Sequence, residues 1–216
     1  MIIRFKSIAA VSVVVASLGN GAHAEIVMFG QSSRTLVLSN AELTQSQAAG
    51  FRKFARKSQH FGAFAVSQST GRWDFYRGYN DLKQVQALTV GKCNIMGKTD
   101  DCEIYAIATA ASLPVNAQSA KGLSGEQQAY LEETYLPKTR SYPRKFAAFV
   151  VNGSFHIGRW GRSYKETAIS DAISACKRYG ARLKGTDPAG VYALRKKLGL
   201  LECHLIDVRR HSDLIK

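Results

Sequence analysis

"FGAFAVSQSTGRWDFYRGY" at residues 61–79 and "FAAFVVNGSFHIGRWGRSY" at residues 146–164 are two versions of one phrase. Each opens with phenylalanine, a small residue, alanine and phenylalanine, reaches a turn, and ends with a tryptophan among arginines. Apolar runs on both sides of turn residues predict a β-hairpin. In the second copy Asn152-Gly153 is a strong signal for a tight turn. We therefore expect two related hairpins.

The same elements follow each hairpin. Fifteen residues after Gly78 in one copy and Gly161 in the other comes a cysteine, Cys93 or Cys176. The residues between have the apolar spacing of a helix. A second cysteine, Cys102 or Cys203, then precedes a strand-like run. Each hairpin is thus expected to lead into a helix and a third strand.

A helix is also expected before each hairpin. The segment LTQSQAAGFRKF resembles LSGEQQAYLEETY further along the chain. Thr44 with Gln47, and Ser124 with Gln127, have the spacing of a capping box, in which the two side chains satisfy free amides at a helix start. One such unit is small for independent stability. The sequence predicts an α+β fold, a tandem duplication of a helix–β-hairpin–helix–strand unit.

The first residues have the features of a secretory signal peptide. A basic head with Arg4 and Lys6 precedes an apolar run at residues 8–18, and AHA at residues 22–24 fits a small-x-small cleavage site. The apolar run is shorter than the roughly 20 residues of a membrane-spanning helix. Cleavage after Ala24 would give a periplasmic or secreted protein, and a retained anchor is the alternative.

The predicted organisation follows from these boundaries. It comprises a signal peptide at 1–24, an N-terminal segment at 25–42, a first repeat at 43–113, a linker at 114–122, and a second repeat at 123–216 with a basic insertion at 177–202.

The four cysteines are expected to form two disulfides in an oxidising compartment. Four cysteines allow three pairings. The repeat favours Cys93–Cys102 and Cys176–Cys203, because these pairs occupy equivalent places in the two copies. Each repeat would then carry one disulfide, and no free thiol would remain as a nucleophile.

The chain has a formal net charge of +14. An exported protein this basic meets acidic partners such as anionic glycans, lipid headgroups or proteins, with nucleic acid less favoured. Solubility alone is the alternative explanation of the charge. The densest basic stretch comprises Lys177, Arg178, Arg182, Lys184, Arg195, Lys196 and Lys197. Since the first copy lacks this insertion, we expect its charges to lie outside the core and to contact partners, or else to form a solvated helix face.

The second strand of each hairpin carries candidate ligand-binding side chains. With the insertion they make up the candidate set Arg72, Trp73, Tyr76, Arg77, Arg159, Trp160, Arg162, Arg195, Lys196 and Lys197. Aromatic rings stack on sugars or bases, and arginine forks hold carboxylates or phosphates. Because one face of each strand must pack on a helix, core packing is the alternative role for the tryptophans.

The strand FGAFAVS, the unit Cys…Asp-Cys-Glu-Ile and the segment LSGEQQ resemble small secreted alphaproteobacterial proteins with a duplicated cysteine-containing domain of unknown function. The resemblance covers residues 43–208. Some relatives carry the label 5-aminolevulinate synthase, an activity that this sequence does not support. That enzyme needs pyridoxal phosphate on a lysine in a much larger fold.

The sequence contains no recognisable catalytic motif. Cys-x-x-Cys, His-Glu-x-x-His, Gly-x-Ser-x-Gly and phosphate-binding loops are missing. His60, His156, His204 and His211 are scattered, so we expect neither a metal nor a cofactor. The favoured function is a non-enzymatic envelope or secreted protein that binds an acidic partner. An envelope hydrolase with an unrecognised site and a host-directed effector are the alternatives.

Overall fold

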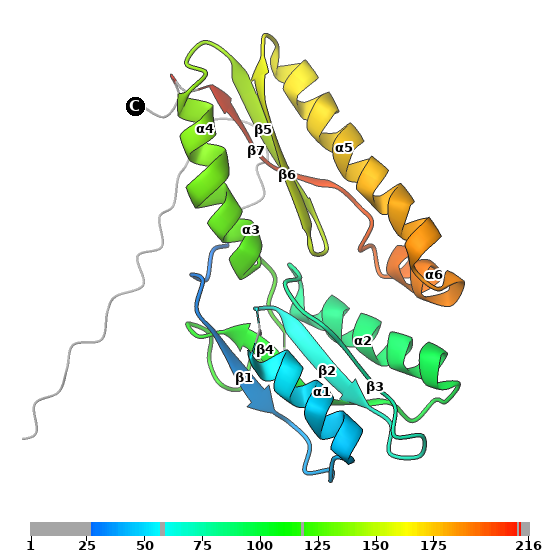
Figure 1. The fold of residues 1–216 in the computed structure, drawn as a ribbon. Helices are drawn as coiled ribbons and strands as arrows, with labels where there is room; N and C mark the ends of the chain where they lie inside the picture. The colour runs from blue at the N-terminus through cyan, green and yellow to red at the C-terminus, as the bar shows by residue number, and fades with distance from the viewer. Residues whose placement is uncertain (1–26, 57–58, 118, 211, 213–216) are drawn as a thin grey trace, which may run out of the picture.

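The computed structural model describes residues 27–56, 59–117, 119–210 and 212 of the chain. These residues form two antiparallel sheets with helices packed on them, one sheet in each half of the molecule (Figure 1). The predicted α+β class is therefore correct. The proposed signal peptide and its cleavage site lie outside the described residues.

The first sheet has the strand order β1-β4-β2-β3. Its strands are β1 (Ser33–Val37), β2 (Gly62–Val66), β3 (Trp73–Tyr76) and β4 (Glu103–Ala110). Helices α1 (Gln45–Arg56) and α2 (Leu82–Gly97) cover its opposite faces. Phe54 of α1 packs on Phe64, whereas Val85 of α2 packs with Ala63. Strand β1 falls in the segment that we expected to precede the first repeat.

The second sheet has the order β6-β5-β7. Its strands are β5 (Phe146–Asn152), β6 (Phe155–Arg162) and β7 (His204–Arg210). One face is covered by the consecutive helical segments α3 (Gly125–Tyr130), η1 (Leu131–Tyr135) and α4 (Leu136–Arg140), and the other by α5 (Lys165–Thr186). Tyr135 packs on Phe149 from one side, and Ala172 packs on Val150 from the other.

The central strands β2 and β5 are apolar on both faces because both faces are covered. All five residues of β2 are buried, and six of the seven residues of β5 are buried. An unbroken apolar run is the pattern expected of a strand between two helix layers, whereas alternation would indicate one exposed face.

The predicted capping boxes form at both first helices. The Thr44 and Gln47 side chains exchange hydrogen bonds with each other's backbone amides, and Ser124 and Gln127 do the same. Both glutamines are fully buried, and each amide also donates to a backbone carbonyl of the following hairpin, at 2.9 and 3.0 Å. The cap thereby fixes each first helix to its hairpin.

The two disulfides are those predicted, Cys93–Cys102 and Cys176–Cys203. Each joins the helix after a hairpin to the start of the strand that follows. Cys93 and Cys176 are fully buried against their sheets. The bonds hold α2 near β4 and α5 near β7.

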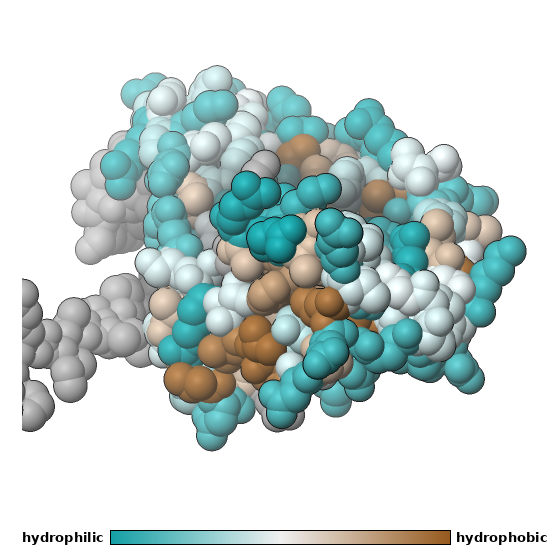
Figure 2. Space-filling model, turned by 60° about the horizontal axis from the view of Figure 1, so that its bottom comes forward, coloured by the Kyte–Doolittle hydropathy of each residue, from teal (hydrophilic) through white to brown (hydrophobic). Residues whose placement is uncertain are grey.

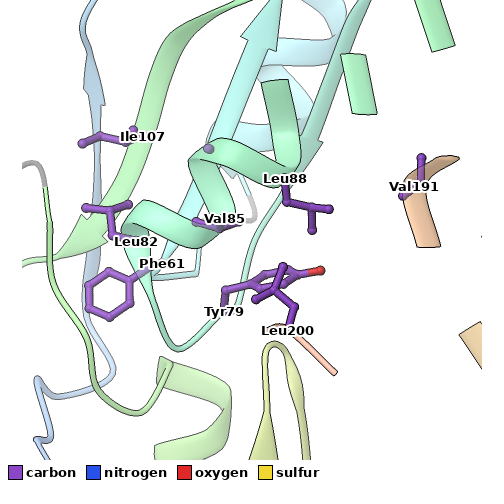
Figure 3. Close-up of a cluster of buried hydrophobic side chains, with 9 residues drawn as sticks. Phe61, Tyr79, Leu82, Val85, Leu88, Ile107, Val191 and Leu200 are labelled. Carbon is purple, nitrogen blue, oxygen red and sulfur yellow. The ribbon is translucent and has the colours of Figure 1, made fainter. Parts of the chain in front are cut away.

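Helix α6 (Ala189–Lys197) lies within the predicted basic insertion and packs on α2 of the other half. Val191 and Leu200 belong to the same buried cluster as Tyr79, Val85 and Leu88 (Figure 3). The insertion therefore contributes to the core, whereas only its charged residues were expected to lie outside it. Its apolar side chains complete the core of the first half.

A buried histidine lies where the first half meets the start of α3. The His60 side chain is fully buried between the rings of Phe29 and Phe61, with centroids 6.5 and 5.3 Å away. Its carbonyl accepts a hydrogen bond from the Gly125 amide, and neither ring nitrogen has a hydrogen-bond partner among the described residues. Burial lowers the pKa of His60, because the charged form is poorly solvated there.

We expect folding stability to fall as the pH drops below about 6.5, the ordinary pKa of histidine. The unfolded chain takes up a proton there, while folded His60 resists it, so stability is present above this pH and lost below it. Burial lowers the pKa of His156 in the same direction. The His60→Phe variant should therefore lose less stability than wild type between pH 7.5 and 5.0 in urea unfolding.

The control for this experiment is His204→Gln, which changes an exposed histidine. It should lose stability with falling pH as wild type does. An equal pH dependence in wild type and His60→Phe would contradict the assignment.

Candidate binding surface

The outer side of α5 and α6 carries a group of exposed cations, called the α5–α6 cationic face below. It comprises the exposed side chains Lys177, Arg178, Arg182, Lys184, Lys196 and Lys197. No ion pair found among the described residues includes any of these six. They are therefore available to an external anion.

The spacing of α5 explains why its cations point outward. Ala168, Ala172 and Cys176 recur at four-residue intervals and are buried against the sheet. In a helix this spacing defines one face, so the residues between them project to the other side. The four exposed cations of α5 thus follow from the apolar stripe opposite them.

The two aspartates within this segment are already engaged. Asp171 accepts from Arg162 at 2.5 Å, and Asp187 accepts from Arg195 at 2.6 Å. No other aspartate or glutamate occurs between residues 167 and 201. The positive charge of the α5–α6 cationic face is therefore not neutralised by acidic residues of its own segment.

Arg195 does not belong to this surface, contrary to our expectation. The residue is 7% exposed, and its guanidinium donates to Asp187 and, at 2.5 Å, to the Tyr79 hydroxyl. It also lies 4.9 Å from the centre of the Tyr76 ring. Arg195 therefore fastens α6 to the first half, and only Lys196 and Lys197 of its triplet face solvent.

The tyrosines around Arg195 stay protonated. Burial raises the pKa of Tyr76 and of Tyr79 to about 12, and the arginine only partly opposes this effect. Burial by itself would lower the pKa of Arg195, but Tyr79, Tyr76 and Asp187 raise it overall. The cluster is a charged arginine and one carboxylate beside two neutral phenols, a structural arrangement with no free base.

Arg72 and Tyr76 lie on one side of β3, as their alternation predicts. Asp74, between them, accepts from Arg72 at 2.7 Å and from Lys92 of α2 at 2.9 Å. The Lys92 ammonium also lies 4.7 Å from the Tyr76 ring centre, a cation–π contact like that of Arg195. The contacts of Asp74 and Tyr76 thus join β3 to α2 and α6. Arg72 stays partly exposed.

The tryptophans serve mainly as packing residues. Trp73 packs against α1 at Gly50, stacks with Phe64 at 5.8 Å, and donates to the Ser46 hydroxyl. Trp160 packs beside Tyr135 and donates to its carbonyl oxygen at 3.1 Å. Each indole thus lies under the first helix of its half, the alternative role that the sequence left open.

The remaining hairpin arginines are dispersed. Arg77 lies 5.5 Å from the centre of the Phe75 ring, and Arg159 donates to the neighbouring carbonyl of Gly158. Arg162 pairs with Asp171. Among the described residues, no ion pair or hydrogen bond connects the hairpin arginines of one half to those of the other. The candidate set is therefore not one site.

Two cavities open on the surface. One, of about 540 Å³, is lined by Ser46, Thr70, Gly71, Arg72, Trp73, Asp74 and Gly97. The other, of about 600 Å³, is lined by Val27, Asn80, Lys121, Gly122, Leu123, Val151, Cys203, His204, Leu205 and Ile206. Neither brings two carboxylates together. Within the described part of the chain, no group of three His, Cys, Asp or Glu side chains is placed to hold a metal ion.

The face shown in Figure 2 is mixed in character. Apolar side chains gather there within a surround of hydrophilic ones. Exposed large apolar residues of the first half include Val37, Leu38, Ile95 and Met96. None of the described helices combines the length and the apolarity needed to cross a bilayer.

Comparison with protein-family models, with curated proteins and with solved structures finds no match to this chain.

Replacing Arg195 by glutamine should destabilise the fold by about 3 kcal/mol, because Asp187 is left as a poorly solvated carboxylate without its partner. The double variant Lys196→Gln/Lys197→Gln should change stability by about 0.5 kcal/mol or less, since both side chains are exposed. Urea unfolding at pH 7 measures both. Equal effects of the two replacements would show that Arg195 does not fasten α6.

Proposed function

We propose that the protein is an exported, non-enzymatic binding protein that holds an anionic polymer of the bacterial envelope through the α5–α6 cationic face. The observation that carries the proposal is six exposed cations on adjacent helices without paired carboxylates. Two disulfides support the proposed export, because such bonds persist in oxidising compartments.

The chemistry of the face suits a polymer. Lysine and arginine side chains on a helix are long and flexible, and each makes a weak ion pair in water. A chain of regularly spaced anions engages several at once and releases its counterions. Affinity then comes from the number of contacts and depends steeply on salt. A small anion would gain little from such an open surface.

We also propose that the two halves are copies of one helix–hairpin–helix–strand unit, with residues 43–109 corresponding to residues 123–208. The strand orders β3-β2-β4 and β6-β5-β7 support this proposal, as do the equivalent disulfides and the glutamine caps. On this view the second copy acquired α6 and the cationic end of α5, and with them a function that the first copy lacks.

The binding proposal is tested by neutralising the exposed cations of α5. The variant Lys177→Gln/Arg178→Gln/Arg182→Gln/Lys184→Gln removes four charges and leaves the buried stripe untouched. We expect wild type to co-sediment with peptidoglycan, lipopolysaccharide or anionic vesicles at 50 mM salt, and binding to fall at least tenfold at about 200 mM. The variant should bind at least tenfold more weakly than wild type at 50 mM.

A matched control removes four exposed cations from the other half, in Arg52→Gln/Lys53→Gln/Arg56→Gln/Lys83→Gln. It has the same net charge as the test variant and should retain most of the binding. Equal losses in both would indicate a response to net charge alone, and the proposed site would be wrong. Failure of wild type to bind any of the three materials would refute the function itself.

A further inference from the structure

The end of the second half that points away from the first half brings three strand ends together. Phe146, the first residue of β5, pairs with Arg162 of β6 and with Arg210 of β7. The loop from α4 to β5 and the loop from β6 to α5 emerge at this same end, at the top of Figure 1. The strand register therefore places segments that are far apart in sequence side by side.

The two loops contact each other. The Lys145 ammonium donates to the Ser163 hydroxyl at 3.0 Å. Ring carbons of Tyr142 lie 3.6 and 3.7 Å from the position that a β-carbon of Gly161 would occupy. Within the first loop, the Tyr142 amide donates to the Thr139 carbonyl at 3.1 Å, and the Lys145 amide donates to the Tyr142 carbonyl at 3.0 Å. These contacts join the exposed side chains of both loops into one surface.

This surface, called the basic tip below, has a net positive charge. It comprises the exposed side chains Arg140, Tyr142, Arg144, Lys145, Tyr164 and Lys165. No ion pair found among the described residues includes any of these four cations. The nearby Asp171 and Asp207 are bound by Arg162 and Arg209. Glu166 is the one acidic residue between residues 134 and 170.

Residues outside the described ranges hold too few acids to neutralise the basic tip. Their acidic side chains are Glu25 and Asp213, and their basic side chains are Arg4, Lys6, Lys57 and Lys216. Two further carboxylates together with Glu166 would still leave one of the four cations of the tip in excess. Its positive charge therefore does not depend on where those residues lie.

Two exposed tyrosines distinguish the basic tip from the α5–α6 cationic face. Tyr164 is 70% exposed and Tyr142 is 46% exposed, and they are the only exposed large apolar side chains among the described residues of the second half. Tyrosine combines an apolar ring with a polar hydroxyl and is favoured where an apolar phase meets water. Lysine and arginine are attracted to the anionic headgroups at such a boundary.

We propose that the basic tip docks on the surface of a membrane that contains anionic phospholipids. Its four cations lie against the headgroup phosphates, and the rings of Tyr142 and Tyr164 enter the interfacial layer. The basic tip shares no residue with the α5–α6 cationic face, and its binding does not rest on the proposed function.

Shape favours a membrane over a soluble polyanion as the partner. The basic tip is formed by two loops at the end of a sheet, and none of its residues lines either of the two cavities described above (Figure 1). A polymer strand gains affinity from a groove or a row of cations that follows its length, such as the outer side of α5 and α6. Cations and tyrosines grouped at one end of the molecule match a broad charged surface.

The test uses the mature protein with Lys177→Gln/Arg178→Gln/Arg182→Gln/Lys184→Gln as its background, because the α5 cations of the other face are then removed. It should co-sediment with vesicles of phosphatidylcholine that contain about 30% phosphatidylglycerol, and not with phosphatidylcholine alone. Adding Arg140→Gln/Arg144→Gln/Lys165→Gln should weaken this binding more than about tenfold, since each cation adds to the attraction. Hydrogen exchange at residues 140–146 and 162–166 should slow when anionic vesicles are added.

The role of the aromatic rings is tested by Tyr142→Ser/Tyr164→Ser in the same background. Vesicle binding should weaken about fivefold without any change in net charge, because the rings no longer enter the interface. Two controls alter exposed residues of the first half. Arg52→Gln/Lys53→Gln/Lys83→Gln removes as many charges as the tip variant, and Val37→Ser/Leu38→Ser removes two exposed apolar side chains. Both should bind vesicles within about twofold of the background protein.

Three results would overturn the proposal. The first is no binding of the background protein to anionic vesicles at millimolar lipid. The second is an equal loss of binding in a tip variant and in its matched control. The third is an equal loss, in Tyr142→Ser/Tyr164→Ser, of binding to dextran sulfate, a soluble polyanion, which would identify a polymer as the partner. Since the background protein lacks the α5 cations, these results are separate from those that test the proposed function.

Discussion

The structure depends on two strands that are apolar on both faces. A strand such as β2 or β5 cannot leave either face in water, so each sheet needs a helix layer above and another below. The order of elements along the chain supplies them. The helix before each hairpin covers one face, the helix after it covers the other, and the disulfide then fixes the second helix to the third strand.

The covering of both sheet faces by helices also determines where charged side chains are exposed. Because helices occupy both faces of each sheet, exposed side chains come mainly from the outer sides of those helices and from strand edges. Acidic residues are few, and several are already bound by arginine or lysine, as Asp74, Asp171 and Asp187 are. Among the described residues, the exposed cations of the α5–α6 cationic face take part in no such ion pair.

Local patterns made much of the fold predictable. The hairpins, the disulfide pairing and the caps at Thr44 and Ser124 each depend on residues close in sequence or on comparison of the two phrases. A similar spacing at Ser163 and Glu166 also suggests a cap, but α5 starts at Lys165 with Tyr164 before it and no side-chain cap. Residue type and spacing therefore indicate a helix start without fixing it.

Contacts between distant segments could not be read from local patterns. Strand β1 is short and pairs with β4, whose partner residues lie 69 to 77 positions later, so no neighbouring hairpin signals it. Arg195 resembles its neighbours Lys196 and Lys197 in sequence, yet only it meets Asp187 and Tyr79. Within the basic insertion, sequence alone could not tell which cations are buried.

The packing of α6 on α2 also has a consequence for the order of events during synthesis. The Gln84 side chain donates to the carbonyl of Leu198, and Val191 and Leu200 close the cluster around Leu88. A nascent chain that has emerged only as far as β4 holds every strand of its first sheet, yet part of its core still faces water. That core is complete only when Val191 and Leu200, near the C-terminus, pack against it. The first half therefore becomes fully packed only once nearly the whole chain has been synthesised.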